Sequence, residues 1–319
     1  MSNPNAKART APASHIDTRT LAGPEFSTPG AAGKAVCGTS SVPETQPRAV
    51  AILIHGWTGH RDRNIVPVAA KLLTDAGLIT HRINLSHCGI PNGHDTISEH
   101  NDFKNDRLDN ATTDVNAVIN LINQGNIPGK GLPLILAGHS RGASQAIRIA
   151  ATAERETWDT VPAAVIALAP PAAHTRFPEH EQTELAENGY VQRPVARATG
   201  GAVRMGPSWF AHRFDEAGNL SGRDVFAEDC RDLTRPLLLI HAENDDAVGP
   251  EHPARFKELL KDASPQRLAH HIIPNTDHNF SARGITWETI EADLHTIHTL
   301  DQHIRHFLDH HLADAPQDN

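Results

Sequence analysis

Cysteine and aromatic residues are both scarce in this chain of 319 residues. The cysteines are Cys37, Cys88 and Cys230, and no two of them have the spacing of a CxxC motif. An odd and sparse set of this kind excludes a disulfide-rich secreted scaffold and indicates free thiols in a reducing compartment. We therefore expect a cytoplasmic protein.

The chain also lacks long apolar runs and an excess of positive charge. Its apolar runs, such as residues 50–54, are far too short to cross a bilayer, and the first thirty residues contain no stretch that resembles a signal peptide. The formal net charge is −9, which argues against a basic surface for nucleic acid. We expect no nucleic-acid partner and no membrane association, and the oligomeric state stays open.

What the chain does contain is an alternation of strand-like and helix-like segments. Short apolar runs have the pattern of strands buried on both faces of a sheet, at 49–56, 78–85, 132–138, 161–170, 235–243 and 268–274. Segments with helical spacing lie between or after them, at 64–77, 111–124, 141–154, 250–262 and about 287–312. This alternation predicts an α/β fold, with a mostly parallel central sheet covered by helices on both faces.

The N-terminus and one long interval depart from the alternation. Residues 1–16 are polar and without period, which predicts a disordered tail, and residues 17–48 suit one or two irregular edge strands. Between core segments 17–170 and 233–315 lies the interval 171–232, which has no buried-strand pattern. We interpret it as a short cap insertion over a ligand site, because long loops without function are uncommon. A loosely packed surface excursion is the alternative.

The cap interval concentrates the few aromatic residues, and Trp209, Phe210 and Phe214 lie within six positions of one another. Aromatic side chains bury large areas, so they must pack on the core, on each other or around a ligand. A ligand pocket over strand ends is mostly apolar with a few polar groups. We therefore expect these three residues to line a substrate pocket.

The third predicted strand runs directly into the pentapeptide GHSRG (138–142), and a predicted helix follows. A tight strand–turn–helix connection strains the backbone of its middle residue and lifts that side chain above the sheet. The positions two residues away come close to neighbouring backbone and must be small, as Gly138 and Gly142 are. The pattern predicts that Ser140 is a nucleophile; the alternative is a serine that only caps the helix.

A serine hydroxyl becomes a good nucleophile only when a base takes its proton, and that base is usually a histidine oriented by a carboxylate. In a parallel sheet these groups belong at the carboxyl ends of the strands. His278 follows the sixth predicted strand and Asp245 follows the fifth. We expect Ser140, Asp245 and His278 to act together, with Asp246 as the alternative acid and Asp277 as a weaker competitor.

The oxyanion of an acyl-transfer intermediate also needs hydrogen-bond donors. The helix after Ser140 offers the backbone N–H of Arg141, and the turn after the first predicted strand offers the backbone N–H of Trp57. The alternative for Trp57 is an ordinary core residue. The Arg141 side chain places a cation beside the nucleophile, to pair with a carboxylate of the protein or of a substrate.

The predicted C-terminal helix is rich in histidine, with some residues at the three- or four-residue spacing that can bind a metal. They are His295, His298, His303, His306, His310 and His311. No further ligand pattern accompanies them, so we interpret them as a solvated face. We expect no metal and no organic cofactor.

Four motifs occur in the order and spacing of one superfamily: HGWTGH (55–60), GHSRG (138–142), HAENDDAV (241–248) and DHNF (277–280). With them the sequence resembles the α/β-hydrolase superfamily from about residue 49 to 312, which implies the α/β-hydrolase fold. Within it, the first two motifs and the short cap resemble small-capped carboxylesterases related to cinnamoyl and feruloyl esterases, also described as serine aminopeptidase-like hydrolases. One departure is SHCGIPNG (86–93), where relatives often have a G-h-G-x-S turn; it puts Cys88 in that loop.

The residues and the resemblance together predict a serine carboxylesterase that forms an acyl-enzyme intermediate. Its expected substrates are small-molecule esters with apolar or aromatic acyl or alcohol groups. The alternatives are a peptidase or amidase with the same three residues and a non-catalytic small-molecule receptor, although a pure binder gains nothing from an activated serine. Dehalogenase and epoxide hydrolase chemistry is disfavoured, because both need an aspartate where Ser140 stands.

Overall fold

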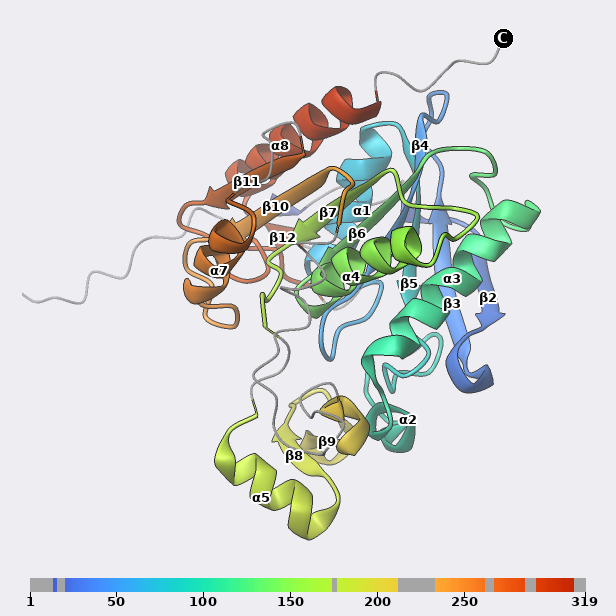
Figure 1. Ribbon diagram of the computed structural model, residues 1–319. Coiled ribbons are helices and arrows are strands. Elements are labelled where there is room, and N and C mark those ends of the chain that lie inside the picture. Colours follow the sequence, from blue (N-terminus) through green and yellow to red (C-terminus); the bar gives the residue numbers. More distant parts are fainter. Residues whose placement is uncertain are drawn as a thin grey trace, which may run out of the picture.

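The computed structural model describes residues 14–15, 21–173, 177–211, 233–261, 267–284 and 291–312. Its centre is an eight-stranded sheet with the strand order β11-β10-β7-β6-β4-β5-β3-β2 (Figure 1). The strands are β2 (Glu25–Pro29), β3 (Ala35–Ser41), β4 (Ala49–Ile54), β5 (Leu78–Asn84), β6 (Leu134–His139), β7 (Ala164–Leu168), β10 (Leu237–Ala242) and β11 (Leu268–Ile273).

The pairing of the strands confirms the predicted α/β fold. The strands from β11 to β5 in this order are parallel to their neighbours, whereas β3 is antiparallel to β5 and β2 is antiparallel to β3. The parallel strands are the apolar runs predicted from the sequence. Of the one or two edge strands expected within 17–48, β2 is the edge strand of the sheet, whereas β3 lies between β2 and β5. Because the parallel strands point the same way, the loops after β4, β6, β10 and β11 meet at one edge of the sheet.

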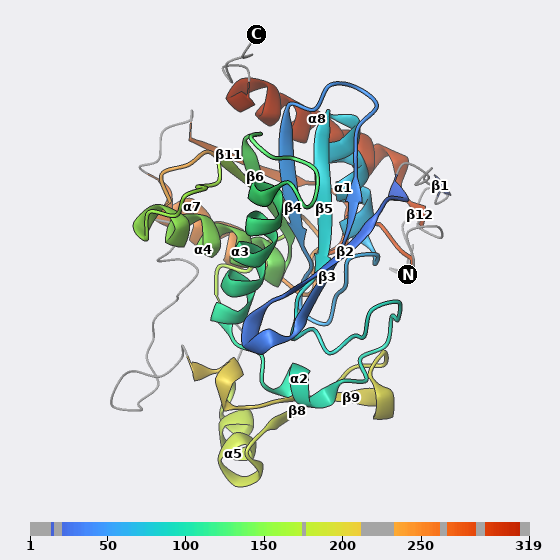
Figure 2. The ribbon, with the colours of Figure 1, turned by 90° about the vertical axis from the view of Figure 1, so that its right-hand side faces the viewer.

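Helices cover both faces of the sheet, as Figures 1 and 2 show. Apolar side chains of α1 and α8 pack on one face, and those of α3, α4 and α7 pack on the other. The bounds are α1 (Ile65–Asp75), α3 (Leu108–Gln124), α4 (Arg141–Arg155), α7 (Glu251–Leu259) and α8 (Leu294–Leu312). The last helix begins later than the expected residue 287, because the carboxylate of Asp293 accepts hydrogen bonds from the backbone N–H and hydroxyl of Thr296 and so caps it.

The insertion after β7 has secondary structure of its own. It contains α5 (Glu179–Asn188) and an antiparallel pair, β8 (Val191–Pro194) and β9 (Ala202–Met205). Figure 1 shows these elements below the sheet, beside the short helix α2 (His100–Lys104) from the loop that follows β5. Side chains of the insertion and of that loop share one apolar cluster. We call residues 85–107 and 177–211 together the cap; residues 174–176 and 212–232 of the expected insertion lie outside the described residues.

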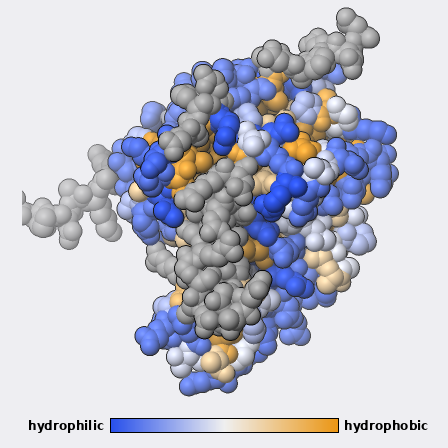
Figure 3. All heavy atoms as spheres, viewed as in Figure 1, coloured by the Kyte–Doolittle hydropathy of each residue, from blue (hydrophilic) through white to orange (hydrophobic). Residues whose placement is uncertain are grey.

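Only a small part of the expected N-terminal tail is described. Ser14–His15 form strand β1, which pairs antiparallel with β12 (Glu291–Ala292). The rest of the tail that precedes them lies outside the described residues. No helix in the described part of the chain is long and apolar enough to cross a membrane. Polar residues predominate on the face drawn in Figure 3, and apolar ones form separate small patches.

Several histidines are buried in the core and between the strand ends. Burial opposes their charged form and lowers the pKa of His55 and His139 to about 3, and that of His60, His81 and His241 to about 4. Each is therefore neutral at pH 7 in the folded protein. In the unfolded chain a histidine binds a proton near pH 6.5. The unfolded state thus binds more protons than the folded state between these values, and stability is lost as the pH falls from 6.5 toward 4.

We expect the free energy of unfolding, measured by urea denaturation, to decrease by about 1.4 kcal/mol per pH unit for each such histidine between pH 6 and pH 4.5. His81 provides the test, because it lies between Ser40 Oγ and the carbonyl of Pro128, at 2.9 Å from each. His81→Asn removes one of the titrating groups. For this variant, the free energy of unfolding should decrease by about 1.4 kcal/mol less per pH unit, which corresponds to one proton. An unchanged slope of the free energy against pH contradicts the explanation.

Candidate active site

The turn between β6 and α4 has the strained geometry predicted for it. Ser140 has φ 56° and ψ −129°, and it is the residue that immediately precedes α4. A Cβ atom at Gly142 would lie 2.2 Å from the carbonyl oxygen of Ile54, and one at Gly138 would lie 2.3 Å from the carbonyl oxygen of Gly142. Both positions therefore require glycine. The close contact seats the start of α4 against the end of β4 and leaves Ser140 partly exposed at the strand ends.

His278 and Asp245 are brought together from two neighbouring strands. Asp245 follows β10 and His278 follows β11, and the distance from His278 Nδ1 to Asp245 Oδ2 is 2.7 Å. The other oxygen, Asp245 Oδ1, accepts hydrogen bonds from the backbone N–H groups of Ala247 and Val248. Burial by itself would raise the pKa of Asp245, but the His278 hydrogen bond and charge and the two N–H donors hold it below its ordinary value. The carboxylate therefore stays ionised at neutral pH.

The competing carboxylates have other surroundings. Asp246 is exposed and forms no hydrogen bond to a described residue. Asp277 Oδ1 accepts from the backbone N–H groups of Asn279 and Ser281, at 3.0 Å each, and so shapes the loop that carries His278. Neither carboxylate is bonded to the His278 ring, which leaves Asp245 as its partner.

His139 also holds the loop of His278, through a contact that no sequence motif indicated. Its Nε2 lies 2.8 Å from the carbonyl oxygen of His278, and the two rings are 4.7 Å apart. A carbonyl only accepts hydrogen bonds, so Nε2 carries the proton and donates. Since His139 precedes Ser140 in the chain, this hydrogen bond ties the backbone of His278 to the serine turn. The structure records no hydrogen bond from Ser140 Oγ to a described residue.

The two backbone groups proposed as oxyanion donors flank the serine. Gly56 lies so close that a Cβ atom there would be 3.4 Å from Ser140 Oγ. Trp57 follows it, and Arg141 is the first residue of α4. Neither the Trp57 N–H nor the Arg141 N–H has a hydrogen-bond acceptor among the described residues. Neither N–H group is therefore used in a hydrogen bond within the described part of the chain.

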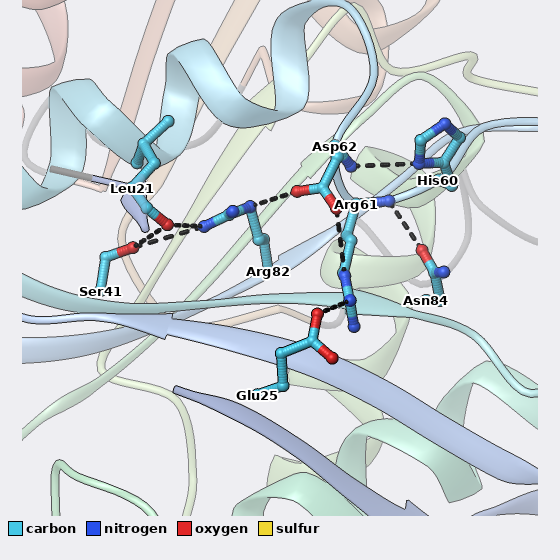
Figure 4. A network of polar contacts seen from close by, with 8 residues as sticks. All are labelled: Leu21, Glu25, Ser41, His60, Arg61, Asp62, Arg82 and Asn84. Atoms are coloured by element: carbon cyan, nitrogen blue, oxygen red, sulfur yellow. Dashed lines mark hydrogen bonds and ion pairs between the residues drawn. The ribbon is translucent and has the colours of Figure 1, made fainter. Parts of the chain in front are cut away.

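A buried ionic network anchors the loop that carries Trp57 (Figure 4). Arg82, on β5, is 1% exposed, and its Nε donates to Asp62 Oδ1 at 2.7 Å. Arg61 contacts both Asp62 and Glu25, and its backbone N–H donates to Asn84 Oδ1 at 2.7 Å. A buried guanidinium is stable only when it is paired. The network therefore fastens the loop to β5 and to the edge strand β2. No sequence motif indicated this network.

Further contacts complete the attachment of this loop. Leu85 N–H donates to His55 Nε2 at 3.3 Å, and His55 Nδ1 lies 2.8 Å from the carbonyl oxygen of Gly56 and donates to it. At the other end of the loop, Asn64 Nδ2 donates to Asn279 Oδ1 at 3.2 Å, next to His278. The Trp57 turn is thus connected directly to the loop of the candidate base.

The three aromatic residues expected in a substrate pocket have different places. Trp209 is 2% exposed, its Nε1 donates to the carbonyl oxygen of Phe103 at 2.6 Å, and its ring also borders a small pocket next to Arg141. Phe210 is fully buried and stacks on Phe177 with ring centroids 4.1 Å apart, inside the apolar cluster of the cap. Phe214 lies outside the described residues.

The side chain of Arg141 has a carboxylate partner within the protein. Its Nη2 lies 3.0 Å from Asp106 Oδ2, and its guanidinium stacks on the Trp209 ring at 4.5 Å from the centroid. Of the two partners that the sequence left open, a protein carboxylate is therefore present. The first residue of α4 thereby joins the serine turn to the cap.

The described residues include no group of three or more His, Cys, Asp or Glu side chains arranged to hold a metal. Histidines of α8 make ring contacts instead; His303 stacks on His271 of β11 with centroids 3.8 Å apart. Cys88 lines the small pocket, but burial raises its pKa to about 12, so its thiol is not ionised at neutral pH. Cys37 is also a free buried thiol.

A serine on a strained strand–helix turn, with a histidine and a carboxylate on later loops at the same sheet edge, defines the α/β-hydrolase class. The chain belongs to the alpha/beta hydrolase family, whose family model matches residues 51–317. No curated protein matches the chain.

Solved structures of esterases and serine hydrolases have the same fold. Est1E from Butyrivibrio proteoclasticus, solved with bound ferulic acid, is 20% identical, with coverage of 91% of this chain and 100% of that one and a TM-score of 0.63. The esterase domain of a Rhodothermus marinus protein is 19% identical, with coverage of 91% and 98% and a TM-score of 0.55. XC6422 from Xanthomonas campestris, described as an α/β serine hydrolase without a lid, is 19% identical, with coverage of 92% and 96% and a TM-score of 0.54.

Proposed function

We propose that this hydrolase is a serine carboxylesterase in which Ser140, His278 and Asp245 form the catalytic triad. The observation that carries the proposal is the 2.7 Å contact between His278 and Asp245 on loops that meet the strained Ser140 turn. A histidine whose Nδ1–H is held by an ionised carboxylate presents Nε2 as a base. The three residues follow the ends of three parallel strands, β6, β10 and β11, which supports their acting at one site.

In the proposed reaction, Ser140 Oγ attacks the ester carbonyl carbon while His278 Nε2 takes the hydroxyl proton. The negative charge that develops on the carbonyl oxygen is stabilised by the backbone N–H groups of Trp57 and Arg141. His278 then gives its proton to the leaving alcohol, and an acyl-Ser140 ester remains. A water molecule, activated by His278 in the same way, releases the acid and restores the serine. The hydrogen bond between Ser140 and His278 forms when the substrate is bound, as is common for catalytic contacts.

Esters with apolar or aromatic groups are the proposed substrates. A small pocket that Gly56 and Arg141 line, on either side of the serine turn, is also lined by the aromatic residues Trp57, Phe103 and Trp209. The bound ferulic acid of Est1E, a structural neighbour, and the esterase domain from Rhodothermus marinus favour ester over amide chemistry for this fold. Phe210 supports the wall through the cap cluster, and Phe214 remains a candidate for it.

Two alternatives use the same residues differently. A peptidase or amidase would need the same triad, and a receptor would bind a small molecule without chemistry. The unpaired N–H groups beside Ser140 favour an enzyme, because a receptor has no oxyanion to stabilise.

An organophosphonate probe should label Ser140, because only an activated serine reacts quickly with it. Intact-mass measurement followed by peptide mapping identifies the modified residue, and Ser140→Ala serves as the control that should not be labelled. Labelling at another residue, or none in a folded sample, would exclude the proposed enzyme.

Asp245→Asn should lower kcat for a good ester substrate by about 10³–10⁴, because the asparagine no longer orients and stabilises the imidazolium form of His278. Asp246→Asn is the matched control. It changes the neighbouring carboxylate, which is exposed, and should alter kcat by less than about threefold. A larger effect at Asp246 than at Asp245 would show that Asp246, and not Asp245, is the catalytic acid partner of His278.

Among substrates, phenyl, cinnamoyl or medium-chain alkyl esters should exceed acetyl esters in kcat/KM. Each well-buried methylene contributes about 10- to 200-fold, so we expect a preference rather than exclusion of acetyl esters. Aminoacyl amides should be poor substrates. A panel of matched esters and amides, assayed with purified protein, measures both comparisons. If an aminopeptidase substrate has the highest kcat/KM, the peptidase alternative replaces the esterase.

A further inference from the structure

A small pocket adjoins Ser140 on the side of the cap. Gly56 and Trp57 form one wall, Arg141 and Asp106 form another, and Phe103 and Trp209 close it. Ser140 does not itself line the pocket but is next to two residues that do: it precedes Arg141, and a Cβ atom at Gly56 would be 3.4 Å from Ser140 Oγ. The pocket volume is about 10 Å³, which is roughly the room that one water-sized group needs.

Buried hydrogen-bond donors without acceptors border this pocket. The indole Nε1 of Trp57 and the guanidinium Nε of Arg141 are both buried, and neither donates a hydrogen bond to a described residue. Buried polar groups almost always have a partner, so an unpaired donor next to a pocket indicates a missing acceptor. Both residues line the pocket, and their backbone N–H groups are the oxyanion donors of the proposed function.

The carboxylate of Asp106 compensates the charge of Arg141, and this determines which kind of hydrogen-bond acceptor fits in the pocket. Arg141 Nη2 lies 3.0 Å from Asp106 Oδ2, and the two side chains are only 12% and 10% exposed. Asp106 is itself held in place, because its Oδ1 accepts a hydrogen bond from Asn110 Nδ2 at 3.1 Å. An anionic group in the pocket would therefore meet the Asp106 carboxylate beside the arginine. A neutral oxygen accepts hydrogen bonds without that repulsion.

We propose that Trp57 Nε1–H and Arg141 Nε–H recognise a neutral acceptor oxygen, such as a ketone, ether or hydroxyl oxygen, on a short branch of the ester substrate. The proposal rests on the proposed function, because the branch belongs to the ester that Ser140 cleaves. The pocket admits one such atom, with the Phe103 and Trp209 rings against the adjoining carbon. The oxygen belongs to either the acyl or the alcohol group, and two experimental arms distinguish them.

The test compares esters that differ by one oxygen in place of a methyl or methylene group. In the acyl arm, ethyl 4-oxopentanoate is compared with ethyl 4-methylpentanoate; in the alcohol arm, 2-methoxyethyl acetate is compared with butyl acetate. Each kcat/KM is divided by the rate of hydrolysis of the same ester by hydroxide. We expect the oxygen-bearing ester to be preferred by about tenfold or more in one arm, because its methyl or methylene counterpart leaves the buried donors unpaired.

Two variants examine the donors and the charge separately. Trp57→Phe keeps an aromatic ring but removes one donor, so it should reduce the preference for the oxygen-bearing ester by about tenfold, whatever it does to the rate on both esters.

Asp106→Asn leaves the Arg141 charge unpaired. It should shift selectivity by about tenfold or more toward the matching carboxylate, which is monoethyl succinate in the acyl arm or 3-acetoxypropanoate in the alcohol arm.

Asp109→Asn is the matched control for the charge. Asp109 Oδ1 pairs with Arg148 Nη2 at 2.8 Å, so it also joins α3 to α4, but its side chain is 71% exposed and does not line the pocket. Its selectivity ratios should equal those of the unaltered protein. Equal shifts in Asp106→Asn and Asp109→Asn would mean that the effect comes from the general charge, and this result overturns the proposal.

The failure of this inference and that of the proposed function give different results. If the phosphonate labels Ser140 and all four esters are hydrolysed without an oxygen preference in either arm, a water molecule satisfies the donors and only this inference is wrong. If Ser140 is not labelled and no ester is hydrolysed, both are wrong. A preference that survives Trp57→Phe unchanged also overturns the assignment of the donors.

Discussion

The close approach of α4 to the end of β4 is the constraint on which the candidate site depends. The backbone at Gly142 comes so near the Ile54 carbonyl that no side chain fits between them. This contact places the first residue of α4 and the turn after β4 on either side of Ser140. The positive φ of Ser140 is the strained conformation that such a short connection requires.

Buried polar groups hold the rest of the site in position around that contact. The Arg82–Asp62 pair fastens the Trp57 loop to the sheet, and the His139 side chain fastens the loop of His278 to the serine turn. Such buried groups lower the stability of the fold in two ways. The ions of the Arg82–Asp62 pair lose their hydration, and the buried His139 ring must remain neutral. The arrangement that positions the candidate site therefore also makes the fold sensitive to acid.

The cap is built from two segments that are distant in the chain. The loop after β5 supplies Phe103, and the insertion after β7 supplies Trp209, whose indole N–H donates to the Phe103 carbonyl oxygen. Arg141 stacks on Trp209 and pairs with Asp106, so the start of α4 contacts both segments. The wall beside Ser140 therefore depends on the packing of the cap against the nucleophile turn. Arg141 therefore links the position of the serine turn to the packing of the cap.

The sequence by itself was enough for the order of strands and helices, the fold and the glycines around Ser140. These features follow from local patterns, because buried parallel strands are continuous apolar runs and a sharp strand–helix turn tolerates only small neighbours. The same patterns suggested Asp245 and His278 as candidates, since each follows a strand at the same sheet edge. Phe210, expected at the pocket wall, shows the limit of such patterns, because hydrophobicity predicts burial but not which neighbour provides it.

Only the tertiary structure decided which groups meet. Asp245 and Asp246 are adjacent aspartates, so the sequence does not distinguish them. In the fold, the backbone N–H groups of Ala247 and Val248 hold one oxygen of Asp245, and its other oxygen faces His278. The Arg141–Asp106 pair likewise joins residues 35 positions apart through the packing of α4 beside the start of α3. Local sequence determines what each segment becomes, whereas contacts between distant segments depend on the side-chain packing and buried polar pairing of the whole fold.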